Sequence, residues 1–438
     1  MTQHPAHTTD DGPIPVVLVM TPSPQQRDTE AEREAEMRSL LKTANRCVVA
    51  VAYQHLPQPI GSTYIGSGKI KEIWDLVEDT EAEEVVFDAL LNPRQERNLE
   101  KLLEVLVVDY AALILHIFAQ NARTHQAMLA VELAQLEHNR SRLKRLWTHL
   151  DRIKAGMNMR GPGEKQLEVD RRLISDRIRE LRRKLHTIEQ RKERAIASRR
   201  DCFKVCLVGY TNAGKSSLLN ALTDAQVLAE DKLFATLDTR TSRLVLHGGH
   251  DVVISDTVGF IRDLPPSLIA SFHATLAEVV EADLLLHVVD ASLPSMEEQI
   301  ATVEGVLRQI GADHIPALMV FNKIDLPHSK TILLAFKRRY RNAVLVSAHQ
   351  RCGLDELRQA IRAAAEQSLQ TLRVRYPVID GKTDAFLRRH CTIIDECYED
   401  EDAVVTLRAD AQLSAQLQDH PVLRVETISG STERPQGS

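Results

Sequence analysis

The chain has 438 residues, too many for one hydrophobic core, and this length predicts two to four domains. A net charge of −6 with 26% charged residues excludes a protein that coats nucleic acid uniformly, although it permits a local basic patch. Six scattered cysteines predict reduced thiols, and no apolar run reaches membrane-spanning length. We therefore expect a cytoplasmic monomer without a transmembrane segment, and leave partial association with a membrane open.

The first predicted domain covers residues 1–115 and begins with a disordered segment. Short apolar runs predict strands at Ile14–Met20, Arg46–Ala52, Glu84–Asp88 and Glu104–Asp109. The stretches between them predict helices at Thr29–Thr43, Lys69–Glu78 and Pro93–Leu103. This alternation indicates a small α/β domain.

Residues 116–200 are predicted to form a long antiparallel helical hairpin, with arms of about 30 residues that extend roughly 45 Å. A leucine stripe runs from Leu129 to Leu150, and a heptad-like repeat runs from Ile174 to Ile188. The glycine-rich stretch Ala155–Glu164 interrupts both helices and forms the predicted tip. The second arm, Arg171–Arg200, carries twelve Lys and Arg against four Asp and Glu. A solvated coiled-coil face and a contact with RNA phosphates both stay open as its meaning.

Residues 201–371 carry the motifs of a nucleotide-binding domain. The apolar strand Phe203–Val208 leads into Gly-x4-Gly-Lys-Ser at Gly209–Ser216, and the helix Ser217–Leu222 follows, as a true phosphate-binding loop requires. Its amides would surround the β-phosphate. Lys215 would neutralise the β- and γ-oxygens, and the Ser216 hydroxyl would bind Mg²⁺.

A second motif selects the base. The predicted strand Ala317–Phe321 delivers Asn322-Lys323-Ile324-Asp325. The Asp325 carboxylate can accept hydrogen bonds from the ring N–H and the exocyclic amine of guanine, whereas adenine offers neither pairing. The strand Ala343–Val346 ends in Ser347-Ala348-His349, where a main-chain amide would support the guanine oxygen. The sequence therefore predicts a GTPase, which hydrolyses GTP to GDP and phosphate.

The switch segments lie between these motifs. The apolar strand Val252–Ser255 runs into Asp256-Thr257-Val258-Gly259, where Asp256 would hold Mg²⁺ through water and the Gly259 amide would meet the γ-phosphate. Thr236 is our choice for the switch threonine that binds Mg²⁺ in the GTP state, with Thr239 and Thr241 as competitors.

Phe260 occupies the position where many GTPases place a water-orienting glutamine. Phenylalanine cannot orient water, so the chain must position water otherwise, hydrolyse slowly or receive help from a partner. Alternatively, Phe260 anchors the switch structurally. Asn212, beside the phosphates, is a candidate ligand for a monovalent cation such as K⁺.

The predicted site has three overlapping sets. The catalytic residues are Lys215, Thr236 and Gly259, and the Mg²⁺ ligands are Ser216 and Thr236. The nucleotide-binding residues are Gly209, Tyr210, Thr211, Asn212, Ala213, Gly214, Lys215, Ser216, Ser217, Phe234, Ala235, Thr236, Leu237, Asp238, Asp256, Thr257, Val258, Gly259, Asn322, Lys323, Ile324, Asp325, Ser347, Ala348 and His349.

Residues from about 16 to 371 resemble the HflX family of ribosome-associated GTPases, in the wider group that contains the Obg and tRNA-modification GTPases. The matching segments are Asn92–Leu99, Ile117–Gln120, Val131–Leu136, Arg160–Glu164, Phe234–Asp238 and Asp256–Pro265. The resemblance implies binding to the large ribosomal subunit and its rRNA, with the hairpin near the peptidyl-transferase centre. It further implies splitting or rescue of stalled ribosomes under stress, GTP hydrolysis stimulated by the subunit, and Mg²⁺ ligation by Ser216 and Thr236. Lys165, His349 and Tyr110 depart from the family pattern, and Lys165 puts the detail of the tip contact in doubt.

Two further segments complete the prediction. The family's N-terminal domain has been linked to ATP, for which Gly61–Lys69 is the local candidate, although tight-turn glycines before a helix explain this segment better. Residues 372–438 are predicted to form a small α+β domain with a disordered end, with strands at Arg373–Ile379 and Ala403–Leu407 and a helix at Gly381–His390. Glu399–Asp402 is predicted to be a solvated acidic loop, and His247–His250 a hairpin turn.

The whole chain thus predicts an α/β multidomain fold: a P-loop GTPase domain with a small N-terminal α/β subdomain, a helical hairpin and a C-terminal α+β domain. A ribosome-binding GTPase is the first hypothesis for its function. A signalling or scaffolding GTPase, whose hairpin binds a protein or a membrane-associated partner, is the alternative.

Overall fold

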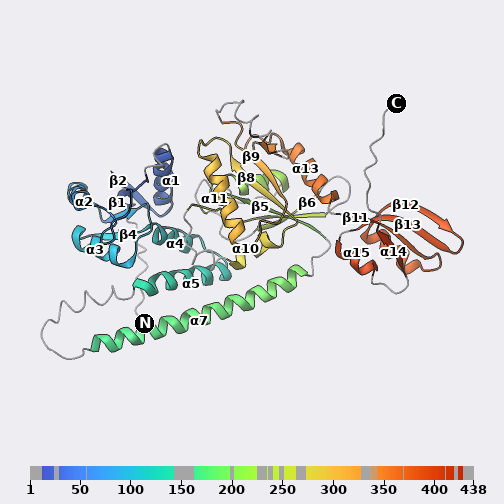
Figure 1. Ribbon diagram of the computed structural model, residues 1–438, viewed down its shortest axis with the longest axis horizontal. Helices are drawn as coiled ribbons and strands as arrows, with labels where there is room; N and C mark the ends of the chain where they lie inside the picture. Colours follow the sequence, from blue (N-terminus) through green and yellow to red (C-terminus); the bar gives the residue numbers. More distant parts are fainter. Residues whose placement is uncertain are drawn as a thin grey trace. The chain divides into compact units, whose positions relative to one another are not determined.

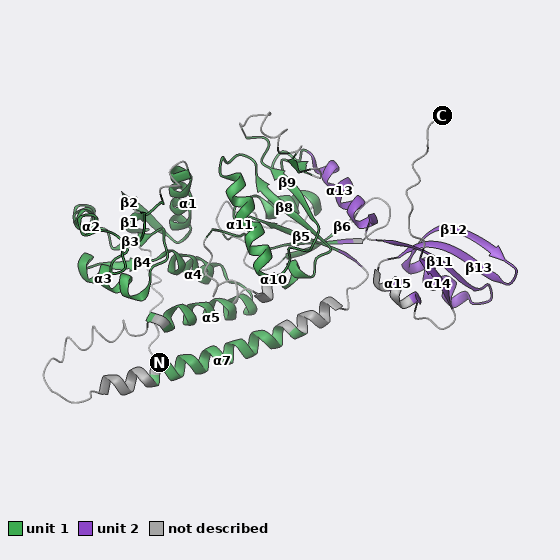
Figure 2. Ribbon diagram, viewed as in Figure 1, with its two compact units in different colours: residues 1–198, 204–244, 253–352 green, residues 199–203, 245–252, 353–438 purple. Residues whose placement is uncertain are grey.

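The computed structural model describes residues 12–23, 29–55, 57–142, 162–197, 202–223, 234, 240–245, 251–262, 273–326, 336, 339–340, 343–367, 369–409, 411–418 and 423–427. The chain divides into two compact units (Figure 2). Unit 1 comprises residues 1–198, 204–244 and 253–352, and unit 2 comprises residues 199–203, 245–252 and 353–438.

Unit 1 begins with a four-stranded parallel sheet in the order β2-β1-β3-β4 (Figure 1). Its elements are β1 (Ile14–Met20), α1 (Glu30–Thr43), β2 (Arg46–Tyr53), α2 (Ser67–Thr80), β3 (Glu84–Phe87), α3 (Pro93–Leu103) and β4 (Leu106–Val108). The predicted strands and helices are confirmed, with ends shifted by at most two residues. Two hydrophobic cores explain the uninterrupted apolar strands, because Val16, Leu18 and Met20 enter one core whereas Val17 and Val19 enter the other.

Three helices follow the sheet: α4 (Tyr110–Asn121), α5 (His125–Arg142) and α7 (Pro162–Ala197). The expected boundary between residues 115 and 116 falls inside α4. Helices α5 and α7 lie side by side (Figure 1), joined by the ion pairs Arg177–Glu132 and Arg182–Glu137. The predicted heptad face of α7 is confirmed, since Ile178, Leu181 and Leu185 are buried.

One part of the predicted tip was wrong. Pro162–Glu164 were expected to interrupt the helix, yet they form the first turn of α7. Proline fits there because the first helical position needs no backbone N–H donor. Residues 155–161 of the tip, and Leu143 and Leu150 of the stripe, lie outside the described residues.

The second sheet, most of whose residues lie in unit 1, has six strands in the order β10-β9-β8-β5-β7-β6. Its strands are β5 (Phe203–Gly209), β6 (Arg240–Val245), β7 (Asp251–Asp256), β8 (Leu284–Asp290), β9 (Ala317–Asn322) and β10 (Val344–Leu345). The accompanying helices are α8 (Lys215–Thr223), α10 (His273–Val280) and α11 (Met296–Gln309). β5, β8, β9 and β10 pair in parallel, so their carboxyl ends share one edge, where the predicted loops begin. The predicted turn at His247–His250 lies outside the described residues.

Unit 2 contains α13 (Leu354–Gln367) and an antiparallel sheet in the order β12-β13-β11-β14. Its further elements are β11 (Gln370–Pro377), α14 (Gly381–His390), β12 (Thr392–Glu399), β13 (Asp402–Ala409), α15 (Ala411–Gln418) and β14 (Arg424–Thr427). The α+β prediction and the helix at Gly381–His390 are confirmed. The acidic segment Glu399–Asp402 connects β12 to β13 and turns at Asp400, whose φ is 55°.

Candidate functional site

The phosphate-binding loop joins β5 to α8, and two of its glycines are required by close neighbours. A Cβ added at Gly209 would lie 2.2 Å from the Val288 carbonyl oxygen of the adjacent strand. A Cβ at Gly214, where φ is +90°, would lie 2.3 Å from Nδ2 of Asn322. The loop can therefore approach β8 and the Asn322 loop only with glycine at both positions.

Lys215 is buried at the centre of this loop, 6% exposed. Its Nζ donates to the carbonyl oxygens of Gly209, at 3.2 Å, and Tyr210, at 2.8 Å. Burial lowers the pKa of Lys215 to about 8, and the negative charge of Asp256 opposes this shift. A buried ammonium in this position favours an anion beside it.

Ser216 and Asp256 lie together at the start of α8 and the end of β7. The Ser216 hydroxyl donates to Oδ2 of Asp256 at 2.6 Å, and Asp256 is fully buried. The next residue, Thr257, donates to the Leu207 carbonyl oxygen at 2.6 Å, which fixes the chain direction after β7. A Cβ at Gly259 would lie 2.8 Å from Cα of Thr211, so Gly259 rests directly on the phosphate-binding loop.

Asn322 and Ser347 organise the predicted guanine loop. The Asn322 side chain donates to the Ala213 carbonyl oxygen at 2.9 Å and accepts from the Ala348 amide at 3.1 Å. The Ser347 hydroxyl donates to Oδ1 of Asp325 at 2.6 Å. The Ala348 amide, one of the predicted guanine donors, is thus bonded to Asn322. These contacts bring Asp325, Ser347 and the phosphate-binding loop into one cluster.

Phe260 continues the strand pairing beyond β7. Its N–H donates to the Gly209 carbonyl oxygen at 3.0 Å, and its carbonyl oxygen accepts from the Thr211 amide at 2.7 Å. The side chain, 3% exposed, belongs to the hydrophobic core that contains Cys206 and Leu285. This packing agrees with the interpretation of Phe260 as a structural anchor of the switch.

Several predicted residues lie outside the described part of the chain, namely Ala235, Thr236, Leu237 and Asp238. Phe234 is described, with a positive φ of 58°, as is Asn212 on the phosphate-binding loop, with φ of 60°.

In the N-terminal domain, Gly66 caps α2 and the ammonium of Lys69 pairs with Glu72 at 2.6 Å. Gly61 and Gly66 thus precede a helix, as the simpler interpretation expected, whereas Gly68 lies in its first turn.

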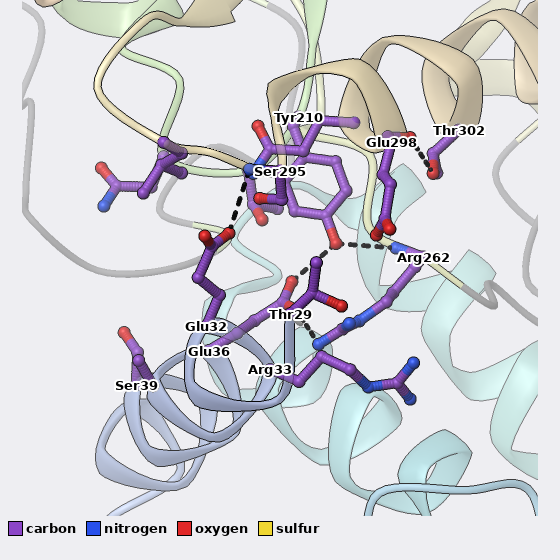
Figure 3. Close-up of a pocket in the computed structure, with 15 residues that line it drawn as sticks. Thr29, Glu32, Arg33, Glu36, Ser39, Tyr210, Arg262, Ser295, Glu298 and Thr302 are labelled. Atoms are coloured by element: carbon purple, nitrogen blue, oxygen red, sulfur yellow. Dashed lines mark hydrogen bonds and ion pairs between the residues drawn. The ribbon is translucent and has the colours of Figure 1, made fainter. Parts of the chain in front are cut away.

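A cavity of about 240 Å³ is lined by residues of both the phosphate-binding loop and α1 (Figure 3), and the sequence did not indicate it. Glu36 of α1 accepts from the Tyr210 hydroxyl at 2.7 Å and forms an ion pair with Arg262. Burial and the charge of Glu36 raise the pKa of Tyr210 well above its ordinary value. Glu32 accepts from the Ser295 amide at 3.3 Å on the same side. Glu36 and Arg262 were not among the predicted site residues, and Tyr210 was predicted only to bind nucleotide.

The six-stranded sheet, the phosphate-binding loop and the Asn322–Asp325 loop define a P-loop GTPase. Family models match in three consecutive segments: a GTP-binding GTPase N-terminal region over residues 31–119, a GTP-binding GTPase middle region over residues 121–199, and a 50S ribosome-binding GTPase over residues 204–323. None of the described helices is long and apolar enough to cross a membrane.

Comparison with curated proteins identifies the family. GTPase HflX of Magnetococcus marinus is 43% identical over 398 residues, which cover 90% of this chain and 92% of that protein. GTPase HflX of Escherichia coli is 43% identical over 383 residues, 86% of this chain and 89% of that protein. The chain belongs to the HflX family of GTPases, and it is an enzyme that hydrolyses GTP. Among solved structures, the SsGBP complex with GDP is 26% identical with a TM-score of 0.47, and the match covers 81% of this chain and 99% of that one.

Proposed function

We propose that the cluster around Lys215 and Asp325 binds GTP with its phosphates on the loop Gly209–Ser216. Lys215 neutralises the β- and γ-oxygens, and the Gly259 amide donates to the γ-phosphate. Asp325 accepts from guanine, and its hydrogen bond from Ser347 supports this role by fixing the carboxylate orientation. The Asn322 side chain, bonded to Ala213, keeps the base and phosphate halves of the site at a constant separation.

Mg²⁺ fits the donor set beside Lys215. The Ser216 hydroxyl and the buried Asp256 carboxylate lie 2.6 Å apart, and oxygen donors of this kind are the ligands that Mg²⁺ prefers. Ser216 and Thr236 would hold the ion directly and Asp256 through water. When bound, the ion neutralises charge on the β- and γ-phosphates. Asn212 is positioned on the same loop as a candidate ligand for K⁺, which a comparison of turnover in K⁺ and Na⁺ tests.

The base assignment is tested by Asp325→Asn. An amide can donate to the second carbonyl of xanthine but cannot accept both donors of guanine, so we expect preference to move from GTP to xanthosine triphosphate. Competition titrations measure the ratio of the two affinities. Asp355→Asn is the matched control, because that carboxylate is on an exposed helix face with 93% of its side chain accessible. Unchanged GTP preference in the Asp325 variant would refute the assignment.

We further propose that the chain binds the large ribosomal subunit through RNA phosphates on the outer face of α7. Arg172, Arg179 and Arg183 are exposed and fall within an arc of about 40° around the helix, over roughly 17 Å of its length. They lie opposite the buried stripe of Ile178 and Leu181. Arg172 and Arg183 have no ion-pair partner among the described residues. This exposed arginine row is the observation that carries the proposal.

Some other basic residues of the arm form ion pairs in the structure, and within the row Arg179 pairs with Asp176. Arg177 pairs with Glu132 at 2.8 Å and with Glu180 at 2.9 Å, and Arg182 pairs with Glu137 at 2.7 Å. The count of basic residues therefore overstates the charge available to RNA. The proposal is confined to the outer row.

The test is sedimentation with purified large subunits, in a non-hydrolysable GTP analogue and in GDP, across a salt series. We expect tighter binding with the analogue. Replacing Arg172, Arg179 and Arg183 together by Gln should lower the slope of log affinity against log salt by about 2 to 3, since each phosphate contact contributes roughly 0.7 to 0.9. The control replaces the exposed Lys71, Arg94 and Lys101 by Gln, which removes the same charge from the N-terminal domain.

Equal slopes in both triple variants would refute the RNA contact of α7. Absence of nucleotide-dependent binding by the unmodified chain would refute the ribosome proposal and favour a scaffolding GTPase with a protein partner.

We also propose that the GTP-bound chain splits or rescues stalled ribosomes under stress. Light scattering of intact ribosomes after addition of the chain with the GTP analogue tests splitting, with the GDP form as control.

A further inference from the structure

Helix α4 contacts the flanks of both predicted switch segments. Near its N-terminus, the Tyr110 hydroxyl donates to the Arg262 carbonyl oxygen at 3.3 Å. At its C-terminus, Nδ2 of Asn121 donates to the Phe234 carbonyl oxygen at 3.2 Å, and the Phe118 ring meets the Phe234 ring edge to face, with centroids 4.7 Å apart. Phe234 precedes Thr236 by two residues, and Arg262 follows Gly259 by three. One rigid helix thus reaches the chain next to both predicted γ-phosphate contacts.

Helix α1 reinforces one of these contacts. Glu36 pairs with the Arg262 guanidinium and accepts from Tyr210, while the Arg262 amide donates to the Tyr210 hydroxyl at 3.1 Å (Figure 3). Three segments therefore meet at one carboxylate: the phosphate-binding loop, the chain after Gly259, and α1. The segment around Arg262 cannot shift without breaking contacts to both α1 and α4.

A single hydrophobic core links these contacts to the hairpin. It combines one face of the N-terminal sheet, α4 and α5 with Ile178, Leu181 and Leu185 of α7. Its members from the GTPase domain are Tyr210, Phe234, Val258 and Ile261. All four come from the phosphate-binding loop or from chain beside the predicted switches.

Phe260 makes this arrangement sensitive to displacement. Val258 and Ile261 pack in the core shared with the hairpin, whereas Phe260 between them packs in the core of the GTPase domain. Close-packed cores respond to a shift by repacking between discrete arrangements and do not deform continuously. A movement of Gly259 toward a γ-phosphate is therefore transmitted into the core that holds α7.

We propose that α4 couples the two switch segments to the helical hairpin, with Phe118, Asn121, Tyr110 and Glu36 as positioning residues. The inference rests on the proposed roles of Thr236 and Gly259 in meeting the γ-phosphate. It gives a role to Ile117–Gln120, a segment of the family resemblance that the nucleotide site does not use. Because α5 begins at His125, only three residues separate it from the end of α4, so a shift of α4 passes directly into the hairpin.

The test is hydrogen exchange of the full-length chain, loaded either with GDP or with a non-hydrolysable GTP analogue. We expect amides of α5 and of the described part of α7 to differ at least threefold in exchange rate between the two states. Phe118→Leu and Asn121→Ala should reduce that difference by half or more, because each removes a contact to Phe234. By linkage, both should also change the ratio of GTP-analogue to GDP affinity.

Phe87→Leu is the matched control. Phe87 is also a fully buried phenylalanine of the N-terminal domain, but it packs in the core on the other sheet face, which contains no GTPase-domain residue among its described members. We expect it to lower stability while keeping the nucleotide-dependent difference. Tyr110→Phe, which removes only the hydroxyl, should give a smaller loss than Phe118→Leu.

Two outcomes would overturn the proposal. The first is equal exchange of the hairpin in both nucleotide states of the unmodified chain. The second is an equal loss of the difference in Phe118→Leu and Phe87→Leu, which would mean that general destabilisation is the cause. Neither measurement uses ribosomes, so the two proposals are tested separately. The chain can fail to bind ribosomes while α4 still couples the switches to the hairpin. It can also bind ribosomes independently of nucleotide while this coupling is absent.

Discussion

Arg142, the last described residue of α5, is the anchor of the hairpin on the N-terminal domain, and Arg142→Met tests its contribution. Its guanidinium donates to Glu96 at 2.6 Å, to Asp109 at 2.8 Å and to the Leu91 carbonyl oxygen at 3.1 Å. The Glu96 and Asp109 side chains are only 4% and 2% exposed. Methionine keeps most of the volume but leaves both carboxylates without this cation. Breaking such a buried pair costs about 3–5 kcal/mol of unfolding free energy.

The loss should depend on pH. Burial alone would raise the pKa of Asp109, but His138 and Arg142 outweigh it and hold that pKa below its ordinary value. In the unmodified chain this carboxylate therefore stabilises the fold above the ordinary pKa, and the contribution is lost as pH falls through the lowered one. In Arg142→Met the charge of Arg142 no longer opposes burial, so the pKa of Asp109 rises. The difference in unfolding free energy between the two proteins should be largest near neutral pH and should shrink as acid protonates Asp109.

Urea unfolding followed by Trp74 fluorescence, in a Trp147→Phe background, measures this domain at pH 7.5 and 5.0. We expect a loss of about 3–5 kcal/mol at pH 7.5 and a smaller loss, by at least about 1 kcal/mol, at pH 5.0. Arg177→Met is the control, because its ion pair with Glu132 is about 40% exposed and should contribute below about 1 kcal/mol. A loss in Arg142→Met no larger than in the control, or one independent of pH, would refute the reasoning.

Three further predictions concern the GTPase domain. Gly214→Ala should weaken GTP binding at least tenfold in fluorescence titrations, because its Cβ would lie 2.3 Å from the Asn322 side chain, whereas Gly305→Ala, with no atom within 4 Å, should leave affinity unchanged. Burial lowers the pKa of His287 to about 4, so the fold favours the neutral ring and loses stability as pH falls from about 6.5 to 4. His287→Leu should remove about 3 kcal/mol of this loss of unfolding free energy at acid pH, as measured by urea titrations. An unchanged dependence of unfolding free energy on pH would contradict the lowered pKa of His287. Ser216→Ala should make nucleotide affinity insensitive to added EDTA, and persistence of full Mg²⁺ dependence would show that the hydroxyl is not a ligand.

The N-terminal sheet was predictable because its strands are buried on both faces and therefore appear as short apolar runs. β1 was predicted with both ends correct, and α3 begins where Asn92 and Gln95 form a capping box and Pro93 occupies the first turn. β12 was missed because five of its residues, including Asp395 and Tyr398, are exposed. A strand without a regular apolar face lacks the alternation of apolar and polar residues by which a strand is predicted from sequence.

The contacts between domains were not predictable. Helix α1 carries Glu30, Glu32, Glu34 and Glu36, and nothing in their spacing distinguishes the carboxylate that meets Tyr210. Glu34 pairs with Arg38 of its own helix, whereas Glu36 pairs with Arg262, 226 positions further along the chain. Such a partner follows from tertiary packing alone. By contrast, the phosphate-binding loop is local in sequence, and its geometry follows from its glycines.

Phe260 connects the catalytic question to this packing. A glutamine there would place an amide among Cys206, Leu285 and Val303, where burial without hydrogen-bond partners is costly. The core of the GTPase domain thus excludes the water-orienting side chain that many GTPases use at this position. Yet the same packing fixes the backbone of Phe260 against the phosphate-binding loop, through its bonds to Gly209 and Thr211. We therefore expect the isolated chain to bind GTP firmly and hydrolyse it slowly. Faster hydrolysis then requires a partner that acts through the segments packed against the hairpin core.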